Sequence, residues 1–232
     1  MKKLALILTL ILLSTVAQAE WISFPETRKT RSYGPIITDI EQHLFAGHPY
    51  RSNDKVTWAH EGTHGANSVL RNKYGKPGFY VLKNAAYTLN EPRTTLSAVS
   101  PKIPRSLRGH IYSLYCVQSR RYWNNQPSYL FDEWIAYTNG TITRNKLQIK
   151  GRRETTAYMI EMAIYSTCVP YTTRSNDPEV KEFTRWMWER TMALVDNDSY
   201  LTDLKTNNDA VNLRKFMQDY YGSDWTKTTL GF

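Results

Sequence analysis

The segment His60-Glu61-Gly62-Thr63-His64 places two histidines four residues apart, with a glutamate directly after the first. On an α-helix, residues i and i+4 lie on the same face, so both imidazoles can reach one metal ion. The pairing suits zinc. Glu61 is rotated away from the two rings, where a general base can act on a water molecule without being a ligand itself. The segment therefore predicts a metal-binding helix with Glu61 as the catalytic base.

The flanking residues favour one long helix around this segment. Asp54 offers an N-cap oxygen, Gly75 is a natural stop, and no helix breaker precedes the first histidine. We therefore expect a helix over residues 54–74. Gly62 and Gly65 inside it each cost about 1 kcal/mol relative to alanine. Their presence indicates a close backbone approach by a partner or a substrate.

The segment resembles the signature of the zincin metallopeptidases, which is His-Glu-x-x-His on a helix with small or uncharged residues between and after the histidines. Gly62, Thr63 and Gly65 follow that pattern. The metzincin extension is absent, because Asn67 and Leu70 stand where that branch has glycine and histidine. The resemblance implies a zinc hydrolase whose third ligand comes from another part of the chain.

We choose Glu133 as the third ligand of this zinc site. It follows Asp132 within residues 127–140, a segment that is otherwise almost wholly apolar. Carboxylates inside an apolar helix are costly unless they are paired or metal-bound. The segment resembles the glutamate-bearing helix of the gluzincin branch, which implies the same role for Glu133. Asp132 is then suited to orient a histidine ligand through its second ring nitrogen.

The residues leave alternatives to Glu133 open. Its charge would also suit the first turn of a helix, where it interacts with the helix dipole. Glu91, His110 and Glu161 are the other candidates for the third ligand. Glu91 precedes a proline and is not expected within a helix. Glu161 lies on a polar stripe of a later predicted helix and could face the site.

A peptidase also needs a donor for the oxyanion that forms when water adds to a carbonyl group. Tyr137 lies one turn after Glu133 and on the same face, so we predict it as that donor. His43 and His48 precede the metal-binding helix and are not assigned to the site.

The N-terminus has the pattern of an export signal. Two lysines precede an apolar run over residues 4–13, and Ala17-Gln18-Ala19 forms a small-x-small cleavage site. We expect cleavage after Ala19 and a secreted or periplasmic protein without a transmembrane anchor, because the apolar run is too short to span a bilayer. Removing these 19 residues leaves 213 of the 232, enough for a single zincin-like metallohydrolase domain over residues 20–232.

Charge and cysteine content constrain the partners. The formal charge of +9 falls to +7 without the two N-terminal lysines, and the remaining basic residues are scattered. A basic balance can favour an acidic partner such as an anionic cell envelope or nucleic acid, but scattered charges indicate a solvated basic surface and do not favour nucleic acid. The resemblance to metallopeptidases implies a peptide or protein substrate, associated with the cell envelope. Cys116 and Cys168 would enter an oxidising compartment. They leave two alternatives open, a disulfide or two buried thiols.

Apolar spacing predicts a mainly helical chain. The predicted helices, besides the metal-binding one, cover residues 36–45, 107–122, 128–138, 153–169, 180–195 and 210–221. Phe79-Tyr80-Val81-Leu82 is the clearest strand, and residues 85–89 can pair with it. We expect an α+β fold that is predominantly α-helical and zincin-like, with a small β element beside the metal-binding helix. The resemblance implies that an edge strand there holds the substrate extended.

The sequence therefore predicts an exported zinc metallopeptidase, with His60, His64 and Glu133 as ligands and Glu61 as general base. One alternative is a non-catalytic envelope or glycan-binding protein with a structural or vestigial metal site. Another is a zinc amidase that acts on cell-wall peptides. Structural zinc sites usually have four protein ligands, so the number of ligands separates the first alternative from an enzyme.

Overall fold

The computed structural model describes residues 20–45, 51–173, 177–195 and 198–232. The predicted export signal and His48 lie outside these residues. The elements in chain order are β1 (Glu20–Ser23), α1 (Pro35–Glu41), α2 (Lys55–Tyr74), β2 (Gly78–Tyr80), β3 (Ala85–Thr88), α3 (Leu96–Val99), α4 (Arg120–Trp123), α5 (Tyr129–Lys146), α6 (Glu154–Thr173), α7 (Pro178–Met192), α8 (Ser199–Thr206), α9 (Val211–Tyr221) and α10 (Ser223–Leu230). Short 3-10 turns cover Ser100–Lys102, Arg105–Leu107 and Asn208–Ala210, and a π-helix covers Ser113–Gln118.

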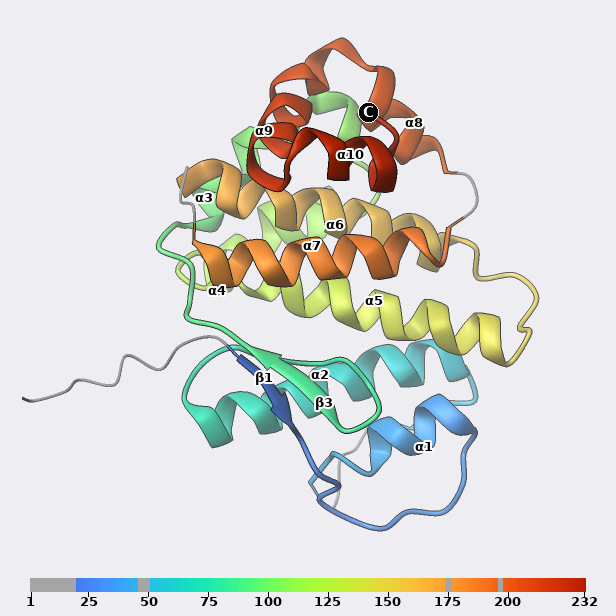
Figure 1. The fold of residues 1–232 in the computed structure, drawn as a ribbon. Helices are drawn as coiled ribbons and strands as arrows, with labels where there is room; N and C mark the ends of the chain where they lie inside the picture. Colours follow the sequence, from blue (N-terminus) through green and yellow to red (C-terminus); the bar gives the residue numbers. More distant parts are fainter. Residues whose placement is uncertain (1–19, 46–50, 174–176, 196–197) are drawn as a thin grey trace, which may run out of the picture.

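The long helices are stacked in layers (Figure 1). Helix α2 packs on α5, α5 on α6, and α6 on α7, while α8, α9 and α10 cover the far side of α6 and α7. This arrangement confirms a predominantly helical α+β fold. Within the described part of the chain, no helix combines the length and apolar character needed to cross a bilayer.

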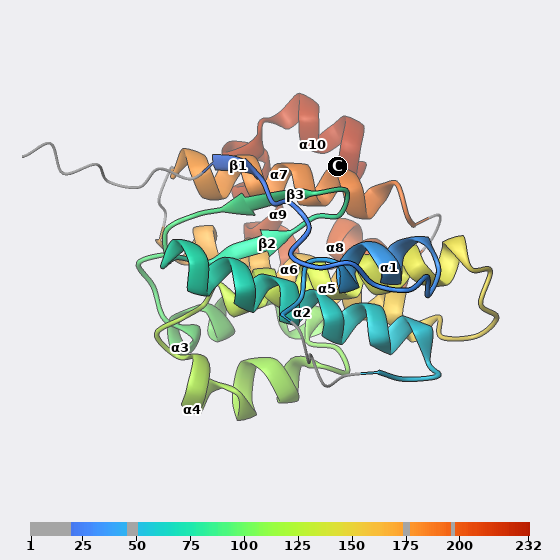
Figure 2. The same cartoon turned by 90° about the horizontal axis from the view of Figure 1, so that it is seen from below.

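A small antiparallel sheet lies beside α2, as expected. Its strand order is β1-β3-β2, with Phe79 of β2 and Trp21 of β1 both paired with Tyr87 of β3. The predicted pairing of β2 with β3 is therefore confirmed. Strand β1 adds a third strand, which the sequence pattern did not predict. Figure 2 shows the sheet beside α2, against which β2 packs.

Helix α2 begins and ends where the sequence predicts. The Asp54 carboxylate accepts hydrogen bonds from the first-turn amides of Val56 and Thr57, and Gly75 adopts the left-handed conformation at φ 67°. The close approach expected at Gly62 is made by α1. A Cβ atom at Gly62 would lie 2.8 Å from Cγ2 of Ile40. This glycine therefore serves packing inside the chain and not contact with a partner or substrate.

The predicted helix over residues 107–122 is wrong. The chain there forms a 3-10 turn, a loop, a π-helix and the short α4. Gly109 N–H donates to the Tyr165 hydroxyl at 3.0 Å, and Ile111 N–H donates to Glu161 Oε2 at 3.3 Å. Glu161 of α6 therefore takes the Ile111 N–H, which a continuous helix over residues 107–122 would pair with the Leu107 carbonyl. The other predicted helices are present, and α5 continues beyond the predicted end to Lys146.

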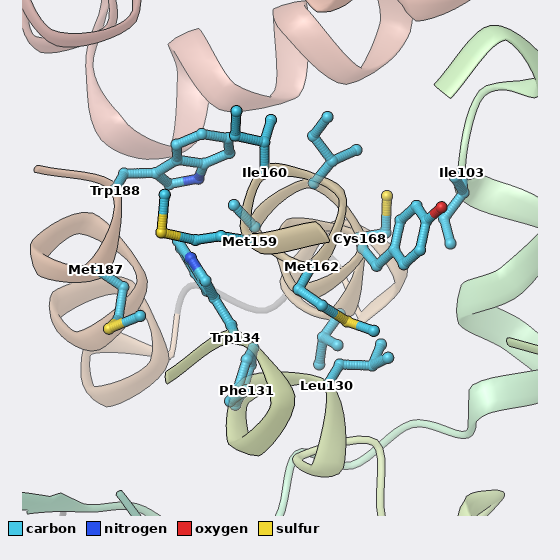
Figure 3. Packing of buried hydrophobic residues seen from close by; sticks show 14 of the residues in the cluster. Ile103, Leu130, Phe131, Trp134, Met159, Ile160, Met162, Cys168, Met187 and Trp188 are labelled. Atoms are coloured by element: carbon cyan, nitrogen blue, oxygen red, sulfur yellow. The ribbon is translucent and has the colours of Figure 1, made fainter. Parts of the chain in front are cut away.

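The larger hydrophobic cluster lies between α5, α6 and α7 (Figure 3). Trp134 of α5 meets Trp188 of α7 edge to face, with ring centroids 5.5 Å apart. The indole N–H of Trp134 donates to Thr191 Oγ1 at 2.9 Å, so its polar atom is satisfied inside the core. A second cluster joins α1, α2 and the sheet. Helix α2 therefore has a buried face toward the sheet and another toward α5.

Cys116 and Cys168 are both buried free thiols in the larger cluster. The disulfide alternative is therefore not formed. Both side chains pack as small apolar groups. Burial raises the pKa of the Cys116 thiol to about 12, which keeps this sulfur protonated and unreactive.

Candidate metal centre

Three predicted ligands meet at the interface of α2 and α5. His60 and His64 lie one turn apart on α2, and their Nε2 atoms are 3.1 Å apart. Glu133 of α5 places Oε2 at 3.5 Å from each of these nitrogen atoms. The side chains are 12 % exposed for His60, 26 % for His64 and 8 % for Glu133. The packing of α2 on α5 thus brings together the ligand set that the sequence predicts.

The three ligand atoms fit a divalent metal ion. In a tetrahedral site with bonds of about 2.0–2.1 Å, two ligand atoms lie about 3.3 Å apart. The observed separations of 3.1, 3.5 and 3.5 Å are close to that value. Glu133 Oε2 is also buried without a hydrogen-bond partner. A buried carboxylate oxygen is costly unless something binds it, and a metal ion would do so.

Asp132 holds His64 from behind, in the role the sequence suggests. Its Oδ1 lies 2.8 Å from His64 Nδ1 and 2.7 Å from Asn67 Nδ2. Asn67 Oδ1 in turn accepts the backbone N–H of Tyr80 at 2.6 Å. When His64 Nδ1 donates to Asp132, its Nε2 is left with a lone pair toward the metal group. This network fixes the ring between α2, α5 and β2.

The two histidines have opposite electrostatic surroundings. Burial alone would lower the pKa of His64, but the negative charges of Glu133 and Asp132 raise it well above its ordinary value. Burial and the nearby His64 instead lower the pKa of His60 well below its ordinary value. In the metal-free protein, the surroundings of His64 therefore favour its protonated form, whereas those of His60 favour its neutral form.

Glu61 lies on an open pocket beside the metal group. The pocket has a volume of about 340 Å³. Its lining residues are Glu61, His64, Ser68, Arg71, Trp123, Tyr129, Asp132 and Glu133. Glu61 is absent from the group of atoms that could hold the metal. Its position on the pocket wall is compatible with action on a molecule in the pocket.

Aromatic rings also lie next to the metal group. The ring of Tyr137 lies against His60, with centroids 4.4 Å apart, and its hydroxyl is 3.0 Å from the hydroxyl of Tyr115. Burial, and then the charge of Glu133, raises the pKa of Tyr115 far above its ordinary value. Tyr137 thus lies near the site as predicted, and it shares its hydroxyl contact with a second tyrosine.

Sequence reasoning missed Tyr115. It is one of sixteen tyrosines and lies in the segment expected to form an ordinary helix. The π-helix found there turns Tyr115 inward, where it is 7 % exposed. π-Helical segments often accompany functional sites, but the sequence has no signal for one here.

The alternative third ligands have other roles. Both oxygens of Glu91 accept hydrogen bonds from Ser128, at 2.9 Å from its N–H and 2.6 Å from its hydroxyl, at the start of α5. Glu161 is buried and accepts from the Tyr165 hydroxyl at 2.8 Å. His110 is exposed and stacks on a tyrosine ring at 5.7 Å. None of the three belongs to the metal-binding group of the described residues.

In strand β2, the backbone N–H and carbonyl of Tyr80 are not free to pair with an extended substrate. The backbone N–H of Tyr80 donates to Asn67, and its carbonyl accepts from Asn139 Nδ2 at 3.2 Å. Both backbone groups therefore already have partners on α2 and α5. The substrate-holding role implied by the resemblance does not fit this residue.

In comparisons with protein-family models, curated proteins and solved structures, nothing matches this chain. Its function is therefore inferred from the residues of the site.

Proposed function

We propose that this protein is an exported, zinc-dependent metallopeptidase of zincin type, most simply an endopeptidase. One observation carries the proposal: His60, His64 and Glu133 converge next to an open pocket that is also lined by Glu61. Two imidazoles and a carboxylate are a common ligand set of catalytic zinc sites. The Asp132 contact to His64 supports the same interpretation, since metal-binding histidines usually have such a partner.

Zinc held by these ligands would polarise a peptide carbonyl and make water more acidic. Glu61 accepts a proton from the attacking water and delivers it to the leaving nitrogen as the C–N bond breaks. Tyr115 keeps its hydroxyl proton because burial and Glu133 raise its pKa. With Tyr137, which touches its hydroxyl, it is suited to donate to the negative charge that develops on the carbonyl oxygen.

The number of ligands favours an enzyme over a structural metal site. Structural zinc is usually held by four protein ligands. Among the described residues, only three potential ligands converge, and the pocket opens beside them. A zinc amidase acting on cell-wall peptides uses the same chemistry, and the substrate assay separates it from an endopeptidase.

The test is the Glu61→Gln variant. It should retain the fold and the zinc content, while turnover falls by about 10²–10⁴-fold, the usual contribution of general acid–base catalysis. Glu26→Gln changes an exposed glutamate away from the pocket and is the matched control. Cleavage is measured by mass spectrometry on a degenerate peptide library and on purified cell-wall peptides.

Each outcome of this assay has a definite meaning. Cleavage of cell-wall peptides alone would favour the amidase. If zinc-loaded wild type cleaves neither substrate class, or if Glu61→Gln cleaves as fast as wild type, the hydrolase proposal fails. The non-catalytic binding protein then becomes the better explanation.

A further inference from the structure

The pocket beside the metal group has one permanently cationic side chain in its lining, that of Arg71. We propose that Arg71 binds a carboxylate of the substrate, about two to three residues from the scissile bond. The inference rests on the proposed function and names the chemical class of the substrate. That class is peptides that have a carboxylate at this distance from the scissile bond, either on an acidic side chain or at the peptide C-terminus.

The distance follows from the two helices that line the pocket. Arg71 is seven residues after His64 on α2, which places it on the same face and about 10 Å further along the helix. Its Cζ atom lies 4.4 Å from the ring centroid of Tyr129. Tyr129 is four residues before Glu133 on α5, or about 6 Å along that helix. An extended peptide rises about 3.3 Å per residue, so a span of 6–10 Å corresponds to two or three residues.

The guanidinium of Arg71 has donors left for a ligand. Its hydrogen bond to Gln126 Oε1 is long, at 3.4 Å, and no carboxylate of the described residues forms an ion pair with it. The nearby Glu91 interacts electrostatically with Arg71, but both Glu91 oxygens already accept hydrogen bonds from Ser128. Arginine presents five donors in a planar fork that matches a carboxylate. The Tyr129 ring covers one face of this fork and leaves its edges available.

Stacked aromatic rings connect Arg71 with the metal group. Tyr129 stacks on Trp123 at 4.9 Å with an interplanar angle of 12°, and Trp123 stacks on Tyr115 at 5.7 Å and 21°. The Tyr115 hydroxyl lies in the field of the Glu133 carboxylate. Tyr129, Trp123 and Tyr115 thus form a continuous stack of rings from Arg71 to the neighbourhood of Glu133, and Tyr129 and Trp123 of this stack line the pocket in which a peptide can lie.

The charges of the pocket are unevenly distributed. Glu61, Asp132 and Glu133 are gathered at the metal group, whereas the positive charge of Arg71 lies at the other end. With zinc bound, the charge of the ion offsets two of these three negative charges, so the metal end keeps a net negative charge, while a substrate carboxylate at Arg71 is attracted. This polarity favours one register of an acidic peptide over the others, so it determines specificity as well as affinity.

The first experiment compares peptide pools that have glutamate or glutamine fixed at each position around the cleavage site. Zinc-loaded wild type should prefer glutamate at one position, two or three residues from the cleaved bond, by about 10- to 100-fold in kcat/KM. Arg71→Gln should lose this preference and keep its zinc, whereas Arg71→Lys should retain part of it. Amidation of the peptide C-terminus separates the two sources of the carboxylate, because only a terminal carboxylate is neutralised by it.

Arg121→Gln is the matched control. Arg121 also lies over a tyrosine ring, at 4.5 Å from Tyr122, but it is exposed and outside the pocket lining. The control should keep the glutamate preference unchanged. A preference that survives in Arg71→Gln, or its absence in wild type that cleaves peptides, would overturn the inference.

A binding measurement keeps this inference separate from the hydrolase proposal. Immobilised Glu61→Gln protein should retain glutamate peptides more strongly than their glutamine counterparts, and the double variant with Arg71→Gln should not. If wild type cleaves nothing but this retention depends on Arg71, the hydrolase proposal fails and the carboxylate site stands. Equal retention of both pools by Glu61→Gln protein would count against the site.

Discussion

Replacement of Asp132 by asparagine tests whether the group around His64 is built to bind metal. Asp132 Oδ1 lies at 2.8 Å from His64 Nδ1 and at 2.7 Å from Asn67 Nδ2. Asparagine has nearly the same shape, and its carbonyl oxygen can still accept from both donors. The substitution therefore removes the negative charge and leaves the packing almost unchanged.

The expected effects follow from these two hydrogen bonds. Loss of a carboxylate behind a histidine ligand typically weakens metal binding by about 10- to 100-fold, or about 1.4–2.8 kcal/mol. Bonds to a charged acceptor contribute about 1.5–3 kcal/mol and neutral ones about 0.5–1.5 kcal/mol, so the free energy of unfolding should fall by about 2–3 kcal/mol. The pKa of His64 in the metal-free protein should also fall, since Asp132 helps to raise it.

Zinc affinity is measured with a competing chelator at mildly alkaline pH, where protons compete least with the metal, and stability by urea unfolding. Asp39→Asn is the matched control. The Asp39 carboxylate also accepts two hydrogen bonds, at 2.9 Å from the Tyr80 hydroxyl and 2.9 Å from the Lys83 N–H, but it lies outside the metal group. The control should lose a similar or smaller amount of stability and keep its zinc affinity. Equal zinc affinities of Asp132→Asn and wild type would refute the reasoning.

Two further predictions concern the ligands themselves. Glu133→Gln should lose most of its zinc affinity, whereas Glu161→Gln should keep it, because Glu161 lies outside the metal group and accepts the backbone N–H of Ile111. Zinc titration of both variants measures the two affinities. A greater loss of affinity in Glu161→Gln than in Glu133→Gln would exclude Glu133 as the ligand. Zinc must also displace the proton that His64 holds, since its pKa is raised well above the ordinary value. Apparent zinc affinity should therefore rise by about tenfold per pH unit below that pKa and level off above it, as measured by titration across pH, with one proton released per zinc bound.

The sequence alone determined the local part of the site. His60 and His64 are four residues apart, so any helix through them must place both on one face. The Asp54 and Gly75 caps fix the ends of that helix through contacts within a few residues, which is why its predicted bounds agree with α2. Glu133 could be predicted from the sequence for a similar reason, because a carboxylate in an apolar helix needs a partner.

Only the tertiary structure decided what surrounds these residues. Residues 107–122 have helical spacing, yet Glu161 of α6 takes the backbone N–H of Ile111, and the segment that follows is a π-helix that places Tyr115 near Glu133. Arg71 joined the pocket because α2 packs on α5 and Tyr129 of α5 holds its guanidinium. These contacts join residues far apart in the chain, and their free energy exists only once the helices have packed. The spacing of residues along the sequence indicates which residues are neighbours on one helix. It contains no information about which residues face each other across the interface between two helices.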